Sequence, residues 1–127
     1  MIIGIPRELL PGENRVAATP TTVPALLKLG YEVVVEAGAG EHAAQPDRAY
    51  EEAGARIVEP GEAWKADLVL AVNEPTDDQI SLMRAGAVLV TFLHPRQDLA
   101  LTEKLAAAGV TGLSMDTVSY THLTLPT

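Results

Sequence analysis

The sequence predicts a single doubly wound α/β domain, in which helices cover both faces of a mostly parallel sheet. Apolar runs that are nearly continuous, such as Val33–Val35 and Leu68–Val72, are typical of strands buried on both faces. Segments with helical character alternate with these runs along most of the chain, which is the pattern of parallel sheets. The 127 residues are enough for one hydrophobic core without disulfides, and the chain contains no cysteine.

Six segments are predicted as strands, because they are short and rich in apolar and β-branched residues. Alternation with helices implies right-handed crossovers and a Rossmann-like or flavodoxin-like sheet. In chain order the predicted strands are Ile2–Ile5, Glu32–Glu36, Arg56–Val58, Asp67–Val72, Val88–Leu93 and Val110–Met115.

The predicted helices are bounded by residues that favour helix ends. The first stops at Gly30 and takes Pro24 into its first turn, with Thr21 or Thr22 as the cap. The fourth begins at Thr76, which has the spacing of a capping box with Gln79. Helical segments are expected at Thr21–Leu29, Pro46–Gly54, Glu62–Trp64, from Thr76 onward, and at Asp98–Ala108.

Composition excludes several classes of function. With 9 basic and 17 acidic residues the net charge is −8, which disfavours binding to nucleic acid and to anionic membrane surfaces. No apolar run approaches the length of a membrane span, so direct membrane insertion is not expected. His42 and His122 lack partners at metal-ligand spacing, so we expect no metal site.

Ligands of open parallel sheets bind at the carboxyl ends of the strands, and four polar stretches follow predicted strands there. The longest is the segment Pro6–Pro20, here called the opening loop, which is long for a strand-to-helix connection. The candidate residues at this rim are Arg15, whose fork suits a carboxylate, Asn73, and His94, whose imidazole can exchange a proton. The four stretches are Arg7–Arg15, Gly38–Gly40, Asn73–Pro75 and His94–Arg96.

A structural alternative stands beside each candidate. The loop charges Arg7, Glu8, Glu13 and Arg15 can pair with one another and hold the loop in place. In the same way His94 can end a strand before proline, and Asn73 can serve as a turn residue.

The stretch from Gly38 to Ala43 fits the dinucleotide pattern G-x-G-x-x-[GA], with Glu59 at a suitable distance. That fingerprint needs a helix that opens directly on the glycines, because the helix N-terminus holds the pyrophosphate. Here Pro46 marks a later helix start, and the glycines follow the second strand rather than the first. We therefore interpret Gly38 and Gly40 as turn residues and expect no cofactor site in this chain.

The chain resembles the N-terminal region of the alanine dehydrogenase/nicotinamide nucleotide transhydrogenase family. The resemblance rests on Ile3–Glu8, Glu13–Pro20, Leu68–Pro75 and Met115–Val118, and it extends over residues 1–118. Residues 119–127 have no family counterpart that we find, so we expect them to be a tail that does not belong to the domain, an artefact of truncation.

Two branches of the family differ at the rim. Alanine dehydrogenases use an arginine, a lysine and a histidine around a 2-oxo acid, and Arg15 and His94 match the first and third. Asn73 stands at the lysine position, and an amide cannot supply the lysine's charge. Asn73 and Met115-Asp116 resemble the transhydrogenase branch, in which the resemblance implies that Arg15 and His94 are inherited rim residues with a structural role.

The resemblance implies the first subdomain of the NAD(H)-binding part of a transhydrogenase alpha subunit. It implies NAD and NADP as cofactors of a complete, proton-translocating enzyme, and none in this fragment, which is expected to be inactive alone. Implied partners are the remaining domains, a beta subunit and a second copy, at the cytoplasmic face of a membrane. The alternatives are an alanine dehydrogenase domain and a non-catalytic α/β binding or regulatory module.

Overall fold

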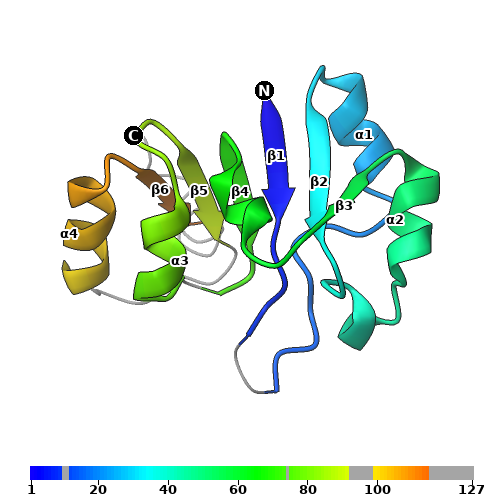
Figure 1. Ribbon diagram of the computed structural model, residues 1–127, viewed down its shortest axis with the longest axis horizontal. Coiled ribbons are helices and arrows are strands. Elements are labelled where there is room, and N and C mark those ends of the chain that lie inside the picture. Colours follow the sequence, from blue (N-terminus) through cyan, green and yellow to red (C-terminus); the bar gives the residue numbers. More distant parts are fainter. Residues whose placement is uncertain (10–11, 74, 92–98, 115–127) are drawn as a thin grey trace, which may run out of the picture.

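A computed structural model describes residues 1–9, 12–73, 75–91 and 99–114. The described chain forms a six-stranded parallel sheet with the strand order β3-β2-β1-β4-β5-β6, which confirms the predicted α/β class (Figure 1). The strands are β1 (Ile2–Ile5), β2 (Glu32–Glu36), β3 (Arg56–Val58), β4 (Leu68–Ala71), β5 (Val88–Thr91) and β6 (Thr111–Ser114). The helices are α1 (Val23–Lys28), α2 (Asp47–Ala53), α3 (Asp77–Leu82) and α4 (Leu99–Ala107), with short 3₁₀ turns η1 (Glu41–Ala43) and η2 (Glu62–Lys65).

Two hydrophobic clusters cover the two faces of the sheet. On one face, Ile5 of β1 packs in a cluster with Val23 of α1 and Tyr50 of α2. On the other, β4 and β5 pack with α3, α4 and Trp64 of η2. Alternate residues of β4 are divided between the clusters, which places them on opposite faces, since strand side chains alternate. The prediction of helices on both faces is therefore confirmed.

Local capping signals predicted the helix ends well. The Thr76 hydroxyl accepts the Gln79 backbone N–H at 3.2 Å, and the Gln79 side chain accepts the Thr76 N–H at 2.8 Å, which is the predicted capping box. Pro24 lies in the first turn of α1, and Gly30 follows that helix with φ +96°. Thr22 occupies the cap position without capping, because its hydroxyl accepts the Thr19 N–H at 3.2 Å.

The fourth strand is one residue shorter at each end than predicted. At its carboxyl end the Val72 N–H donates to Glu8 Oε2 at 2.8 Å, so it is not available to the sheet. The last two residues of the predicted Val88–Leu93 strand and the last of Val110–Met115 lie outside the described residues, as does the expected tail 119–127. The domain boundary at Val118 stays a prediction.

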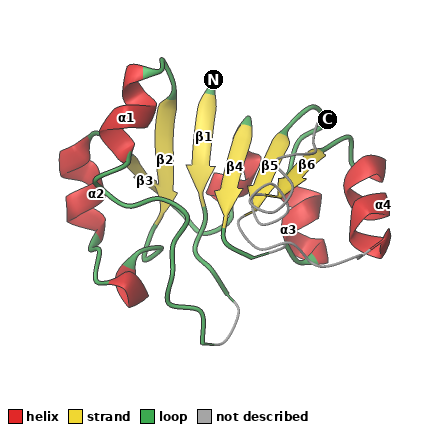
Figure 2. Cartoon of the chain, turned by 180° about the vertical axis from the view of Figure 1, so that it is seen from behind, coloured by secondary structure: helices red, strands yellow, loops and turns green. Residues whose placement is uncertain are grey.

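The strand order creates one topological switch point, between β1 and β4. From β1 the chain builds outward to β2 and β3, then returns and builds outward in the other direction from β4 to β6. The connections after β1 and β4 therefore lead in opposite directions from neighbouring strands, and ligands of such sheets bind at a switch point of this kind. Figures 1 and 2 show the described parts of the opening loop extending beyond the carboxyl ends of the strands at this place.

Candidate functional site

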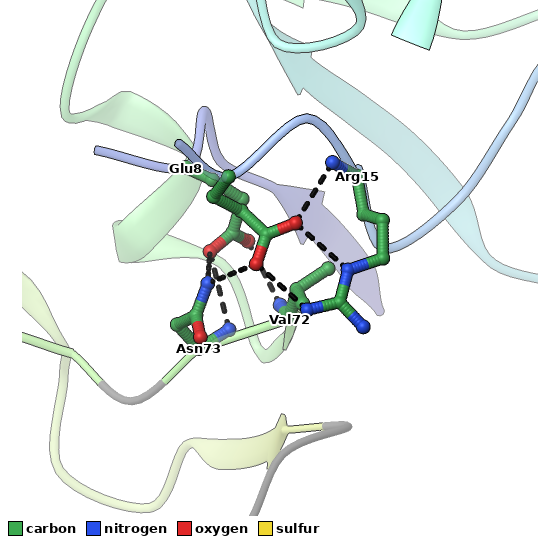
Figure 3. Close-up of polar contacts among 5 residues, drawn as sticks. Glu8, Arg15, Val72 and Asn73 are labelled. Carbon is green, nitrogen blue, oxygen red and sulfur yellow. Dashed lines mark hydrogen bonds and ion pairs between the residues drawn. The ribbon is translucent and has the colours of Figure 1, made fainter. Parts of the chain in front are cut away.

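The start of the opening loop is joined to the end of β4 across the switch point. Glu8 lies three residues after β1, and its Oε2 accepts the Val72 N–H at 2.8 Å. Its Oε1 accepts the backbone N–H of Asn73 at 3.1 Å (Figure 3). One carboxylate thus satisfies two consecutive backbone donors that the sheet leaves unpaired. These bonds fix the start of the opening loop to the end of β4, which is the neighbour of β1 in the sheet.

Asn73 connects two carboxylates through a single amide nitrogen. Its Nδ2 donates to Glu13 Oε1 at 2.8 Å and to Glu8 Oε1 at 3.4 Å, so the second contact is the weaker one. This bridge closes the opening loop, because Glu8 lies near its start and Glu13 near its middle. The side chain of Asn73 therefore acts here as a neutral donor to two acidic groups.

Glu13 and Arg15 form a bidentate ion pair. The Arg15 Nε donates to Glu13 Oε2 at 2.8 Å and the Arg15 Nη2 donates to Glu13 Oε1 at 2.9 Å. The backbone N–H of Arg15 adds a third bond to Oε2 at 2.9 Å. The Glu13 side chain is only 5% exposed, whereas that of Arg15 is 61% exposed, so the guanidinium lies over the carboxylate close to the surface.

The two carboxylates differ in acidity. Hydrogen bonding to Arg15 lowers the pKa of Glu13 to about 2, against the opposing effect of its burial. Burial raises the pKa of Glu8, and the N–H donors of Val72 and Asn73 only partly offset that effect. We call the four side chains Glu8, Glu13, Arg15 and Asn73 the switch-point cluster. It carries two acidic groups and one cation.

A buried tyrosine holds the far end of the opening loop. The Tyr50 hydroxyl of α2 donates to the Ala18 carbonyl oxygen at 2.6 Å, and the side chain is fully buried. Burial, followed by the charge of Asp47, raises the pKa of Tyr50 to about 12, so the hydroxyl keeps its proton and its donor role. The loop is therefore fixed at both ends by hydrogen bonds to other elements.

The glycines after β2 pack closely against α2 and do not fit a dinucleotide fingerprint. A Cβ at Gly40 would lie 2.6 Å from the Gln45 carbonyl oxygen and 2.8 Å from the Tyr50 ring. Gly38 donates its N–H to Asp47 Oδ1 at 2.9 Å, and α2 begins only at Asp47, after the cap at Pro46. The glycines are thus turn residues, while the absence of a bound cofactor from the chain stays a prediction.

The structure brings together two of the three candidate rim residues, Arg15 and Asn73, through Glu13. His94 lies outside the described residues. The alternative in which the loop charges pair with one another holds for Glu13 and Arg15, whereas the Arg7 Nη1 lies near Gly38, 3.6 Å from an ideal Cβ there. Sequence reasoning missed Glu8 and Glu13 as the centre of the cluster. The available signal was two acids in a loop that leaves the first strand of a parallel sheet.

Two features are absent from the part of the chain that the structure describes. Within the described residues, no group of three or more His, Cys, Asp or Glu side chains could hold a metal ion. No helix in that same part of the chain is long and apolar enough to cross a membrane.

The fold and the cluster define a Rossmann-like α/β domain with a polar site at its switch point. A family model described as "Alanine dehydrogenase/PNT, N-terminal domain" matches residues 4–125, and the chain belongs to this family. The match confirms the resemblance found in the sequence. The family includes oxidoreductases of both branches, as the individual relatives show.

Relatives of known sequence come from the two branches. The chain is 49% identical over 118 residues to the NAD(P) transhydrogenase subunit alpha of Haemophilus influenzae, covering 93% of this chain and 23% of that protein. It is 42% identical over 120 residues to an alanine dehydrogenase of Bacillus subtilis, covering 94% of this chain and 32% of that protein. The chain therefore spans 23% and 32% of the length of these two relatives.

Similar solved structures come from the same two branches. A transhydrogenase from Sinorhizobium meliloti superposes with a TM-score of 0.87 at 40% identity, covering 91% of this chain and 35% of that one. An L-alanine dehydrogenase superposes with a TM-score of 0.83 at 36% identity, covering 90% of this chain and 32% of that one. Both branches thus share this domain, so the fold by itself does not assign the reaction.

Proposed function

We propose that this chain is the first subdomain of the NAD(H)-binding part of a transhydrogenase alpha subunit. In the complete enzyme a hydride passes between NADH and NADP, coupled to proton movement across a membrane. The chain contributes the folded subdomain and its switch-point cluster, while the dinucleotide sites belong to other parts of the protein. On this proposal the isolated chain has no activity.

The observation that carries this proposal is the asparagine at position 73 and its hydrogen bonds to two carboxylates. Binding a 2-oxo acid requires cations, and the alanine dehydrogenase pattern places a lysine at this position. Here the position holds an amide that donates to Glu8 and Glu13. Within the cluster, Arg15 is bound to Glu13, so no guanidinium or ammonium remains uncompensated there. Identity is also higher to the transhydrogenase subunit than to the alanine dehydrogenase.

The proposal extends to cofactors, partners and location. NAD and NADP are the cofactors of the complete enzyme, and its partners are the remaining domains, a beta subunit and a second alpha subunit. The assembly lies at the cytoplasmic face of the membrane in which proton movement occurs. The net charge of −8 fits contact with protein domains rather than with anionic lipid.

The test is an assay of the complete gene product that contains this chain, assembled with its beta subunit. We expect reduction by NADH of an NADP⁺ analogue whose reduced form has its own absorbance band. We expect no oxidation of NADH when pyruvate and ammonium are supplied instead. In parallel, titration of the 127-residue chain with NADH should give no saturable binding.

The contrary outcomes are distinct from one another. Oxidation of NADH that depends on pyruvate and ammonium would assign the protein to the alanine dehydrogenase branch. Tight, saturable NADH binding by the isolated chain would instead overturn the placement of the cofactor sites in other parts of the protein.

A further inference from the structure

Strands β1 and β4 join the two halves of the sheet through a short ladder, here called the β1–β4 junction. Its register contains two residue pairs, Ile3 with Leu68 and Gly4 with Val69. The ladders of β1 with β2 and of β4 with β5 contain four pairs each. Because the ladder at the switch point is shorter than these neighbours, contacts at its two ends contribute more to holding the halves together.

A carboxylate closes the β1–β4 junction at each end. At the amino end, Asp67 precedes β4 and its Oδ2 accepts the N–H of Ile2 in β1 at 2.7 Å. At the carboxyl end, Glu8 follows β1 and accepts the N–H groups of Val72 and Asn73 at 2.8 and 3.1 Å. Each carboxylate thus connects one of the two strands to a backbone donor at the end of the other.

The two carboxylates differ in the charges around them. Arg84 forms an ion pair with Asp67, so a cation compensates the charge at the amino end. At the carboxyl end, β4 offers Glu8 only neutral donors. Among the described residues, the charged groups that act on Glu8 are Glu13 and Arg15 of the opening loop, and the hydrogen bonds of Arg15 go to Glu13. The charge of Glu8 therefore has no cation bonded to it.

These surroundings favour the protonated form of Glu8. Burial raises the pKa of Glu8 above its ordinary value of 4.5, and the charge of Glu13 adds to that effect. Glu8 Oε1 makes the longer contacts, with the N–H and the Nδ2 of Asn73 at 3.1 and 3.4 Å, and it shares that Nδ2 with Glu13 Oε1 (Figure 3). A proton on Oε1 would therefore displace the weaker contacts and leave the 2.8 Å bond from Val72 on Oε2.

We propose that Glu8 makes the carboxyl end of the β1–β4 junction pH-sensitive, so that this end is held more firmly when Glu8 shares a proton with Glu13 and loosens when Glu8 ionises. A proton from the solvent forms an O–H bond on Glu8 Oε1, which then donates to Glu13 Oε1. Ionisation leaves two carboxylates side by side with a single cation, Arg15. The amino end, where Arg84 pairs with Asp67, does not respond over the same range. The inference is independent of the proposed function, because it concerns the domain and not the reaction.

The experiment measures hydrogen exchange of the Val72 and Ile2 amides by NMR in the 127-residue chain, from about pH 5 to about pH 8. Each rate is compared with that of the same amide in an unstructured chain, which gives a protection factor. Protection of Val72 should fall about threefold or more as the pH rises, because the stabilising effect of a raised pKa is lost on ionisation. Protection of Ile2, which is bonded to Asp67, should stay constant. The titration of the Glu8 carboxyl carbon should have the same midpoint as the change at Val72.

Variants assign the pH dependence to its source. Glu8→Gln cannot ionise and should abolish it, whereas Glu13→Gln should reduce it by removing the like charge. Glu62→Gln, which removes a charge from the exposed pair with Lys65, should leave it unchanged.

Three results would overturn the proposal. The first is constant protection of Val72 over the whole pH range. The second is an equal fall at Val72 and Ile2, which would show that the domain opens as a whole. The third is a dependence that persists in Glu8→Gln, which would assign it to another titrating group such as His94. If Glu8→Gln does not fold, the two midpoints in the unmodified chain decide, and a midpoint at Val72 that differs from that of Glu8 counts against the proposal.

Discussion

Glu8 lies near the start of the opening loop and Glu13 near its middle, and both accept hydrogen bonds from the same amide nitrogen of Asn73. Their acidities nevertheless shift in opposite directions. Burial raises the pKa of Glu8, whose other partners are neutral backbone donors. The bidentate contact with Arg15 lowers the pKa of Glu13 to about 2. A dedicated cation, more than the degree of burial, therefore determines which carboxylate is held ionised.

The two shifts make opposite contributions to stability as the pH changes. The pKa of Glu13 falls below its ordinary value of 4.5, so its ionised form stabilises the folded state above that pH. This contribution is lost as the pH falls from 4.5 towards 2. The pKa of Glu8 lies above 4.5, so its contribution is present below that pH and is lost as the pH rises through the raised value.

The largest expected effect comes from removing the Glu8 carboxylate. Glu8→Ala leaves the part-buried N–H groups of Val72 and Asn73 without their acceptor and should lower the free energy of unfolding by about 2–3 kcal/mol. Glu8→Gln keeps one acceptor oxygen but presents its amide NH2 to the other backbone N–H, so it should lose less than Glu8→Ala, about 1–2 kcal/mol. Urea denaturation at pH 7 measures both. Equal stability of Glu8→Ala and the unmodified chain would show that water replaces the acceptor.

A smaller, pH-dependent effect is expected for Glu13. Glu13→Gln should lower the free energy of unfolding by about 1–2 kcal/mol at pH 7, less than for a fully buried pair because Arg15 is mostly exposed. The deficit should shrink as the pH falls from 4.5 towards 2, since the unmodified residue then becomes protonated. Denaturation curves over a series of pH values measure it.

The control for Glu13 is the exposed pair of Glu62 and Lys65. Their side chains are 50% and 55% exposed at an N–O distance of 2.9 Å, and the pair lies far along the chain from the opening loop. Glu62→Gln should change the free energy of unfolding by less than about 0.5 kcal/mol. A deficit in Glu13→Gln that is equally small, or that stays constant to low pH, would contradict the assigned ionisation of Glu13.

Local rules were sufficient for most of the fold. Short segments rich in apolar and β-branched residues predicted all six strands, and the Thr76–Gln79 spacing predicted a capping box, because these features depend on neighbours in the sequence. The end of β4 was predicted too late, at Val72 rather than Ala71. Apolar character cannot show that Glu8, 64 residues earlier in the chain, takes the Val72 N–H.

The site was predicted less completely than the fold, for the same reason. Arg15 and Asn73 were chosen because each follows a predicted strand, and the structure does bring them to one cluster. Glu13, which joins them, could not be assigned, since a charged loop residue gives no sign of its partner 60 residues away. The strand order, which makes the end of β1 adjacent to the end of β4, is the missing information.

The pKa values of Glu8 and Glu13 should shift in the same direction when each carboxylate has a cation beside it. Asn73→Lys places an ammonium group where Nδ2 now lies between Glu8 and Glu13, so the pKa of Glu8 should fall below its ordinary value instead of lying above it. NMR titration of the Glu8 side-chain carboxyl measures the change. Because the new pair is partly exposed, the free energy of unfolding should change by only about 1 kcal/mol in either direction.

The matched control is Asn73→Met, because a methionine side chain is close in length to that of lysine and carries no charge. It should remove the amide donor and leave the pKa of Glu8 raised, since the burial that raises it remains. A fall of the Glu8 pKa in both variants would attribute the effect to loss of the amide and not to the new cation. A fall in Asn73→Lys alone would show that one residue determines whether this cluster holds one paired carboxylate or two.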